Sequence, residues 1–127
     1  MTPIPDDVRR FILTSVPSVP YLEAALLLHR PPHQELTCPE VARALYLPPQ
    51  KVMELLESLV AAGLVDVLPG EKTRYRYAPR DPALATAIDR LAEAYASDLV
   101  AVANLIHDST RKNARRFADA FKLRKDS

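Results

Sequence analysis

This chain of 127 residues has little of several residue types, and each shortage excludes a class of protein. Cys38 is its one cysteine, which excludes an internal disulfide and a metal site built from several thiolates. With only two glycines, Gly63 and Gly70, the chain has no glycine-rich loop that could cradle a phosphate. No apolar run approaches the roughly 20 residues that a membrane-spanning helix needs. A lone thiol is typical of a reducing compartment, so we expect a cytoplasmic protein.

Recognisable catalytic motifs are missing as well. The sequence contains no G-x-S-x-G, Walker, dinucleotide-binding or H-E-x-x-H pattern. A metal ion would have to draw on His29, His33 and Cys38, but Pro31-Pro32 breaks the helix that would place both imidazoles on one face. We therefore predict a protein that is not an enzyme and that holds neither a metal ion nor a cofactor.

Cys38 itself has two interpretations. At the start of a helix, a thiol can have a lowered pKa and sense oxidants. The second interpretation is a small, half-buried residue in a helix-capping motif. We favour the second, because the chain has no other thiol with which Cys38 could pair.

The net charge of +1 hides an asymmetry along the chain. The first 110 residues have 10 basic and 14 acidic side chains, whereas residues 111–127 have seven basic and two acidic ones. A basic tail therefore follows an acidic body. Tails of this kind are more often solvated helices than ligand sites.

Proline marks the boundaries of the predicted helices. All twelve prolines lie within the first 82 residues, and proline is tolerated in the first turn of a helix but not in its interior. Thr37 and Glu40 have the spacing of a capping box, and Gly63 suits the left-handed position that closes a helix. Together with the apolar spacing, these signals predict helices over residues 6–16, 18–28, 37–45 and 49–62.

A strand pattern follows these helices. The segments that flank Pro69-Gly70-Glu71-Lys72 alternate apolar and polar residues, which predicts a two-stranded β-hairpin near residues 64–78. The alternation places Tyr75 and Tyr77 on one face of the second strand and two arginines on the other. The tyrosines could stack on bases, but packing under the hairpin is the ordinary role of such residues.

The last third of the chain has neither proline nor glycine after Pro82. Its apolar residues recur over about six turns, which predicts one nearly straight helix over residues 83–107, an interruption at Asp108-Ser109-Thr110 and a final helix. A core of about 60 residues cannot cover a stripe of this length, so we predict a homodimer. The alternative is a monomer in which the N-terminal helix folds back over the stripe. The predicted dimer interface comprises Phe11, Leu84, Ile88, Leu91, Tyr95, Leu99, Val102, Ile106, Phe117 and Phe121.

The order of elements between residues 18 and 79 resembles a winged helix-turn-helix. A helix is followed by a short capped helix, a tight proline turn, a second helix and a hairpin. In residues 36–45, 52–65 and 75–77 the chain resembles the MarR-like group of bacterial transcriptional regulators. This pattern is fairly specific for the fold and much less specific for the target.

The resemblance implies a mainly α fold with a small β-hairpin. It implies a single domain, residues 1–127, with a winged helix-turn-helix core at 18–79 and flanking dimerisation helices at 1–17 and 80–127. It also implies a small-molecule effector, of a chemistry that the residues leave open.

In this group, the helix after the turn enters the major groove of DNA, and the hairpin, called the wing, contacts the backbone or the minor groove. The resemblance thus implies a transcriptional regulator that binds double-stranded DNA as a homodimer. The implied DNA-binding residues are Gln50, Lys51, Met53, Glu54, Glu57 and Ser58 in the helix and Lys72, Arg74 and Arg76 in the wing.

The acidity of the core departs from this pattern. Residues 18–66 have three basic and six acidic side chains. Glu54 and Glu57 would repel phosphates, although glutamate can accept a hydrogen bond from cytosine. The alternative function is therefore a winged helix that binds protein instead of DNA.

Overall fold

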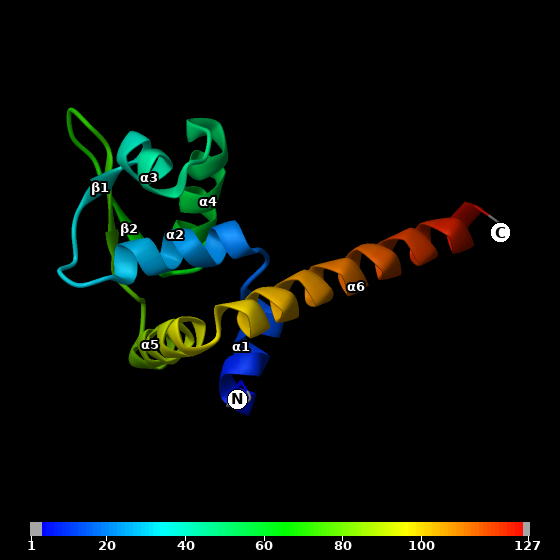
Figure 1. The fold of residues 1–127 in the computed structure, drawn as a ribbon. Helices are drawn as coiled ribbons and strands as arrows, with labels where there is room; N and C mark the ends of the chain where they lie inside the picture. The colour runs from blue at the N-terminus through cyan, green and yellow to red at the C-terminus, as the bar shows by residue number, and fades with distance from the viewer. Residues whose placement is uncertain (1–3, 126–127) are drawn as a thin grey trace.

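The computed structural model describes the backbone of residues 4–125 and the side chains of residues 4–112 (Figure 1). Its three strands form one antiparallel sheet in the order β1-β3-β2. This arrangement confirms the predicted mainly α fold with a winged helix-turn-helix core and a flanking helical segment on each side. The elements in chain order are α1 (Asp6–Ser15), α2 (Val19–His29), β1 (Leu36–Thr37), α3 (Cys38–Leu45), α4 (Pro49–Ala61), β2 (Val65–Leu68), β3 (Arg74–Tyr77), α5 (Pro82–Ser97) and α6 (Leu99–Lys125).

Local capping signals begin the helices of the core where the sequence predicts them. The Ser18 hydroxyl accepts a hydrogen bond from the Tyr21 amide and caps α2. At α3, the Glu40 amide donates to the Thr37 hydroxyl at 3.3 Å, and the Thr37 amide donates to the Glu40 carboxylate at 3.0 Å. The predicted capping box is therefore confirmed, and it satisfies two amides that a helix start leaves without partners.

Two residues with positive φ end the helices of the helix-turn-helix. Gly63 follows α4 with φ +78°, as predicted, and a Cβ there would lie 3.1 Å from the Cβ of Arg80. Tyr46 ends α3 with φ 56°, a left-handed conformation that is unusual for a side chain of this size. The Tyr46 side chain is 94% exposed, so it gains no packing from this conformation.

The hydrophobic core is one cluster that extends from the winged helix-turn-helix, α2 to β3, into the flanking helices α1, α5 and α6. Helix α2 has buried residues on more than one face, as its apolar body predicts. The buried stripe of α4 is the predicted one, Val52, Leu55, Leu56 and Leu59. Tyr75 of β3 is also buried, so this tyrosine packs beneath the wing.

Strand β1 was not predicted. Leu36 pairs with Tyr75, and Thr37 pairs with Arg74, which adds a third strand to the hairpin. A strand of two residues is too short to show an alternating pattern. It is defined by its tertiary pairing with β3, and it ends where the capping box begins.

The prediction of one straight helix over residues 83–107 is wrong. Helix α5 ends at Ser97, and α6 begins at Leu99. The side chain of Asp98, between them, accepts a hydrogen bond from the Ala101 amide at 3.0 Å and so caps the start of α6. The predicted interruption at residues 108–110 is also wrong, because α6 continues through it. The Thr110 hydroxyl contacts the carbonyls of Ile106 and Pro17, both at 3.0 Å, so a residue typical of helix ends is accommodated within the helix.

Helix α1 packs against α5 and α6, where four residues of the predicted dimer stripe are buried within one chain. Ile88, Leu91, Val102 and Ile106 are each 1% exposed or less, so they belong to the core of the chain itself. This is the folded-back arrangement that the alternative interpretation expected. Of the other residues of the stripe, Phe11, Leu84 and Tyr95 are half-buried and Leu99 is 54% exposed. The side chains of Phe117 and Phe121 lie outside the described residues.

Within the described part of the chain, no single helix is both long and apolar enough to cross a membrane. Helices α1 and α2 meet the length and composition criteria only as a pair, which is bent by 113°. Five of the residues of α2 are buried in the core, which accounts for its apolar character.

We predict that Tyr46→Gly raises the free energy of unfolding by about 0.5–1 kcal/mol. Glycine adopts positive φ without the steric cost of a Cβ, and the exposed tyrosine ring has little packing to lose. Urea denaturation measures the difference. Tyr46→Ala is the matched control, because it removes the ring and keeps the strain, so it should give no gain. A loss of stability in the glycine variant would contradict this account.

Candidate nucleic-acid interface

The six predicted DNA-binding residues of α4 share its solvent-exposed face. Gln50, Lys51, Met53, Glu54, Glu57 and Ser58 are all exposed, opposite the buried apolar stripe of the same helix. The helix thus presents a face of five polar side chains and Met53, on which Lys51 is the one cation. A face of this kind, on the second helix of a helix-turn-helix, has the geometry that reads base edges in the major groove.

The wing residues are exposed in the alternation that the sequence predicts. Arg74 and Arg76 point away from the core on either side of buried Tyr75, and Lys72 lies in the turn between β2 and β3. The Tyr75 hydroxyl donates to the sulfur of Met53 at 3.5 Å, which joins the wing to α4. Burial, followed by the charges of Cys38 and Glu57, raises the pKa of Tyr75, so its hydroxyl stays a donor.

A groove of about 800 Å³ lies between the start of α3, the exposed face of α4 and the wing. It brings together three of the predicted residues, Met53, Lys72 and Arg74. The other predicted residues of α4 lie beside the groove, on the exposed face of the helix, and do not line it. The groove also contains two groups that the sequence analysis did not select, Arg43 and Glu35.

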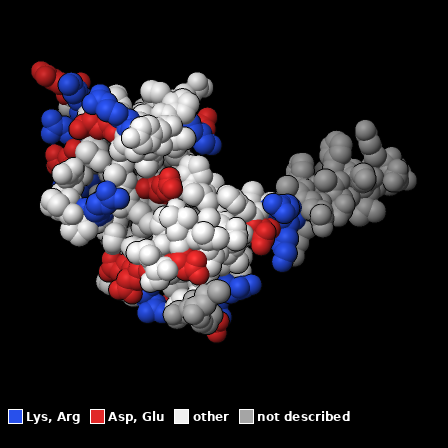
Figure 2. All heavy atoms as spheres, viewed as in Figure 1, with Lys and Arg blue, Asp and Glu red and all other residues white. Residues whose placement is uncertain are grey.

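Both wing arginines are paired with carboxylates. A guanidinium nitrogen of Arg74 lies 3.5 Å from the Glu35 carboxylate, and one of Arg76 lies 3.5 Å from that of Asp66. Figure 2 shows blue and red side chains intermingled over the wing, at the upper left of the molecule. The wing is therefore less positive than a count of its arginines suggests.

Sequence reasoning missed Glu35 because it lies in an irregular segment between a proline pair and the capping box. No spacing rule connects position 35 with position 74. Arg43 could have been found, since it follows Glu40 by three residues on a helix whose start the capping box fixes.

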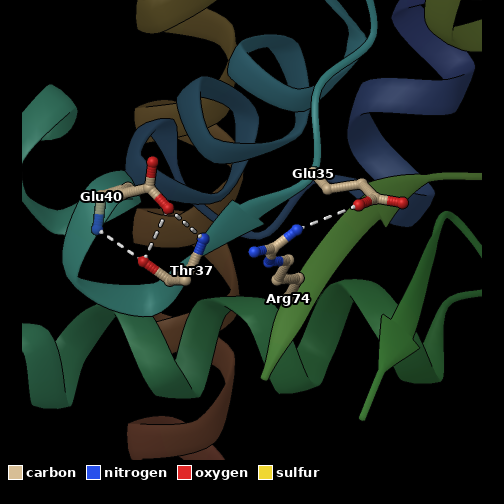
Figure 3. Close-up of polar contacts among 4 residues, drawn as sticks. All are labelled: Glu35, Thr37, Glu40 and Arg74. Atoms are coloured by element: carbon tan, nitrogen blue, oxygen red, sulfur yellow. Dashed lines mark hydrogen bonds and ion pairs between the residues drawn. The ribbon is translucent and has the colours of Figure 1, made fainter. Parts of the chain in front are cut away.

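The start of α3 forms one wall of the groove, and its two titratable groups behave differently (Figure 3). Hydrogen bonds from the backbone and the hydroxyl of Thr37 hold the pKa of the Glu40 carboxyl below its ordinary value, with a further contribution from the charges of Arg74 and Arg43. Burial raises the pKa of the Cys38 thiol, and this thiol donates to the Pro49 carbonyl at 3.4 Å. Cys38 is therefore a buried structural residue, and the interpretation of an oxidant sensor with a lowered pKa is not supported.

Solved structures of similar fold are regulators. A MarR family transcription regulator is 27% identical, with 91% of this chain and 81% of that chain covered and a TM-score of 0.51. A MarR family protein from Bacillus stearothermophilus is 24% identical, with 93% and 81% covered and a TM-score of 0.53. The homodimeric winged helix-turn-helix DNA-binding domain Mb0332 from Mycobacterium bovis, described as a possible ArsR-family regulator, is 19% identical, with 79% and 94% covered and a TM-score of 0.53. A comparison with curated protein sequences gives no match.

The chain has a winged helix-turn-helix fold with a MarR-like architecture, and the proteins with which it shares this fold include transcriptional regulators. A family model described as the sugar-specific transcriptional regulator TrmB matches residues 24–82. That range begins within α2 and contains the helix-turn-helix and the wing, so the similarity to TrmB lies in the winged core.

We predict that the Glu40 cap makes the protein less stable in acid. A carboxyl whose folded pKa is lowered contributes stability above its unfolded pKa, and this contribution is lost as the pH falls through the folded pKa. Glu40→Gln keeps a side-chain acceptor at the same position of the capping box but does not titrate. Between about pH 5.5 and pH 3, the free energy of unfolding should therefore decrease more in the wild type than in Glu40→Gln. Urea denaturation at a series of pH values measures both curves, and parallel curves would refute the role of Glu40.

Proposed function

We propose that this protein is a homodimeric transcriptional regulator that binds double-stranded DNA through α4 and the wing. The observation that carries the proposal is one groove that Met53 of the exposed face of α4 lines together with Lys72 and Arg74 of the wing. A recognition helix in the major groove places the neighbouring phosphodiester backbone between that helix and the wing. The groove lies in this position, and it contains the cations Arg43, Lys72 and Arg74.

Each group has a distinct role in this complex. Gln50 and Glu54, near the start of α4, contact base edges, where glutamine can bind adenine and glutamate can accept from cytosine. Lys51, together with the cations of the groove, contacts phosphates and fixes the position of the protein on the duplex. Met53, Glu57 and Ser58 complete the face that meets the major groove.

The carboxylates of the recognition face give the wing a large share of the phosphate contacts. Glu54 and Glu57 are exposed on the same face as Lys51, and their repulsion of phosphate opposes binding by that helix. Arg74, Arg76 and Lys72 lie on the wing, away from these two carboxylates along the chain. The wing therefore supplies affinity that is independent of sequence, while the helix supplies specificity.

Support for a homodimer comes from α6. Its last contact with the rest of the chain that the structure describes is the hydrogen bond from Thr110 to Pro17. Helix α6 continues to Lys125, roughly 20 Å further, and extends away from the other elements (Figure 1). The part of α6 beyond Thr110 is marginal as a helix in water without a packing partner. A second copy would provide that partner, and the similar domain Mb0332 is described as homodimeric.

Leu99 and Val100 are exposed by 54% and 64% at the start of the same helix, and they offer an apolar surface to that second copy. We assign the interface to Leu99 and Val100 together with Phe11, Leu84 and Tyr95. This set takes the place of the longer stripe that the sequence predicts. Two wings and two recognition helices then meet half-sites about one duplex turn apart.

The remaining expectations follow from the same class of protein. A regulator that binds genomic DNA acts in the cytoplasm of a bacterial cell. A small-molecule effector would act by changing the spacing of the two recognition helices. The TrmB description names sugars, but the match is confined to the winged core, so it supports DNA binding and does not assign an effector to this chain.

We predict that replacing Arg74 and Arg76 together by alanine weakens binding to every duplex. Each lost phosphate contact should also reduce the slope of log affinity against log salt by about one. A fluorescence titration against pooled genomic fragments at two salt concentrations measures both effects. Gln50→Ala should instead change which fragments are preferred.

Arg10→Ala is the matched control for the wing variant, because Arg10 is exposed on α1, away from the groove. It should leave affinity unchanged. If the wild type shows no saturable binding at about 50 mM salt, where phosphate contacts are strong, the DNA-binding proposal is overturned and the alternative of a protein-binding module takes its place.

We predict that the protein has twice the 14.2 kDa mass of one chain in solution at micromolar concentration. Light scattering coupled to size-exclusion chromatography measures this mass. Leu99→Glu and Val100→Glu place charge in the proposed interface and should shift the protein toward the monomer. The matched control is Val67→Glu on the wing, which replaces an apolar side chain of similar exposure, 43%. A wild-type protein of 14.2 kDa would refute the dimer.

A further inference from the structure

We propose that the Glu35 carboxylate occupies the place of a DNA phosphate on Arg74, so that binding to DNA requires an exchange of ion pairs and Glu35 limits the affinity of the wing. This inference rests on the proposed function, since it concerns the same groove. It assigns a role to a residue that lies outside the recognition helix and outside the wing.

The position of Glu35 follows from the sheet. Glu35 immediately precedes β1, whose residues Leu36 and Thr37 pair with Tyr75 and Arg74 of β3. This pairing holds the two side chains at neighbouring positions, and Figure 3 shows the Arg74 guanidinium directed toward the Glu35 carboxylate. The nitrogen–oxygen distance is 3.5 Å. Both side chains line the groove in which the proposed phosphodiester backbone lies.

The pair is open to exchange. The side chain of Arg74 is 54% exposed and that of Glu35 is 44% exposed, and an exposed ion pair of this kind is weak in water. A phosphate oxygen can form the same charge-assisted contact with the guanidinium. Arg74 therefore has two competing anionic partners, one within the chain and one on the DNA.

The other carboxylates near the wing are committed to the fold. The Glu40 carboxylate accepts hydrogen bonds from the Thr37 amide and hydroxyl, at 3.0 and 2.9 Å, as the cap of α3. Asp66 lies directly opposite Arg76 in the β2–β3 register, so this pair stabilises the hairpin itself. Among the described contacts, Arg74 is the one polar partner of the Glu35 carboxylate. Removal of the Glu35 carboxylate therefore leaves the backbone hydrogen bonds of the sheet intact.

The exchange has a thermodynamic signature. When Arg74 moves to a phosphate, the duplex releases a counterion, and the freed Glu35 carboxylate attracts a cation from solution. The second event partly cancels the first, so the wild type has a shallower salt dependence than its phosphate contacts alone would give. Without the Glu35 charge, the cation uptake disappears.

The experiment is a double-mutant cycle on the full-length protein with Glu35→Gln, Arg74→Ala and the combination of both, measured by fluorescence titration with a duplex that the wild type binds. Glu35→Gln should bind about two- to fivefold more tightly than the wild type. Its log–log salt slope should become steeper by up to about one. In the Arg74→Ala background, the same substitution should give a much smaller change in both quantities, because only the direct repulsion between Glu35 and phosphate is then removed.

Two further variants separate this exchange from a general effect of charge. Glu93→Gln removes one exposed carboxylate from α5 and should leave affinity unchanged. Glu54→Gln removes a carboxylate from the recognition face, and its effect should persist in the Arg74→Ala background because it does not act through Arg74. Thermal denaturation of each variant shows that the fold is retained.

The outcomes distinguish the inference from the proposed function. If the wild type binds no duplex, both are overturned. If the wild type binds DNA and Glu35→Gln does not bind more tightly, or if its gain is undiminished without Arg74, the ion-pair exchange is overturned and the DNA-binding function stands.

Discussion

The pairing of β1 with β3 is the interaction on which the recognition surface depends. It involves only Leu36 and Thr37 on one side and Arg74 and Tyr75 on the other. Thr37 is also the N-cap of α3, so the strand that closes the sheet ends where the helix-turn-helix begins. A single residue thus links the wing to α3, and the groove between them exists because both are fixed to the same short strand.

The charges of this surface are balanced more closely than those of a simple basic patch. The exposed face of α4 has one cation and two carboxylates, and each wing arginine has a carboxylate within 3.5 Å. Weak, exposed ion pairs are readily exchanged in water. Such a surface attracts phosphates weakly, which favours dependence on the base sequence over dependence on the salt concentration.

The helices that flank the winged helix-turn-helix pack on one another and extend the hydrophobic core. Helix α1 covers apolar residues of α5 and α6, and the Asp7–Arg90 ion pair and the Thr110–Pro17 hydrogen bond lie at these contacts. The sharp change of direction at Asp98 is what allows α6 to pack on α1 and then continue away from the core.

The sequence by itself determined the features that depend on neighbours along the chain. Capping at Ser18 and Thr37, the left-handed Gly63 and the alternation around Tyr75 were all predictable, because each is a local interaction within a few residues. The apolar spacing of α4 placed its buried stripe, whereas the candidate DNA-binding residues on its other face came from the resemblance to the MarR-like group.

Only the tertiary structure decided the features that join distant residues. Strand β1 is too short to have a pattern of its own and is defined by its partner in β3. The break at Asp98 lies in a stretch without proline or glycine, where an aspartate on a polar face and an aspartate that caps a new helix look alike in the sequence. The Glu35–Arg74 pair spans 39 positions, and no local spacing encodes it. Its existence depends on the sheet, because long-range contacts are set by the packing of whole elements and not by the pattern within one of them.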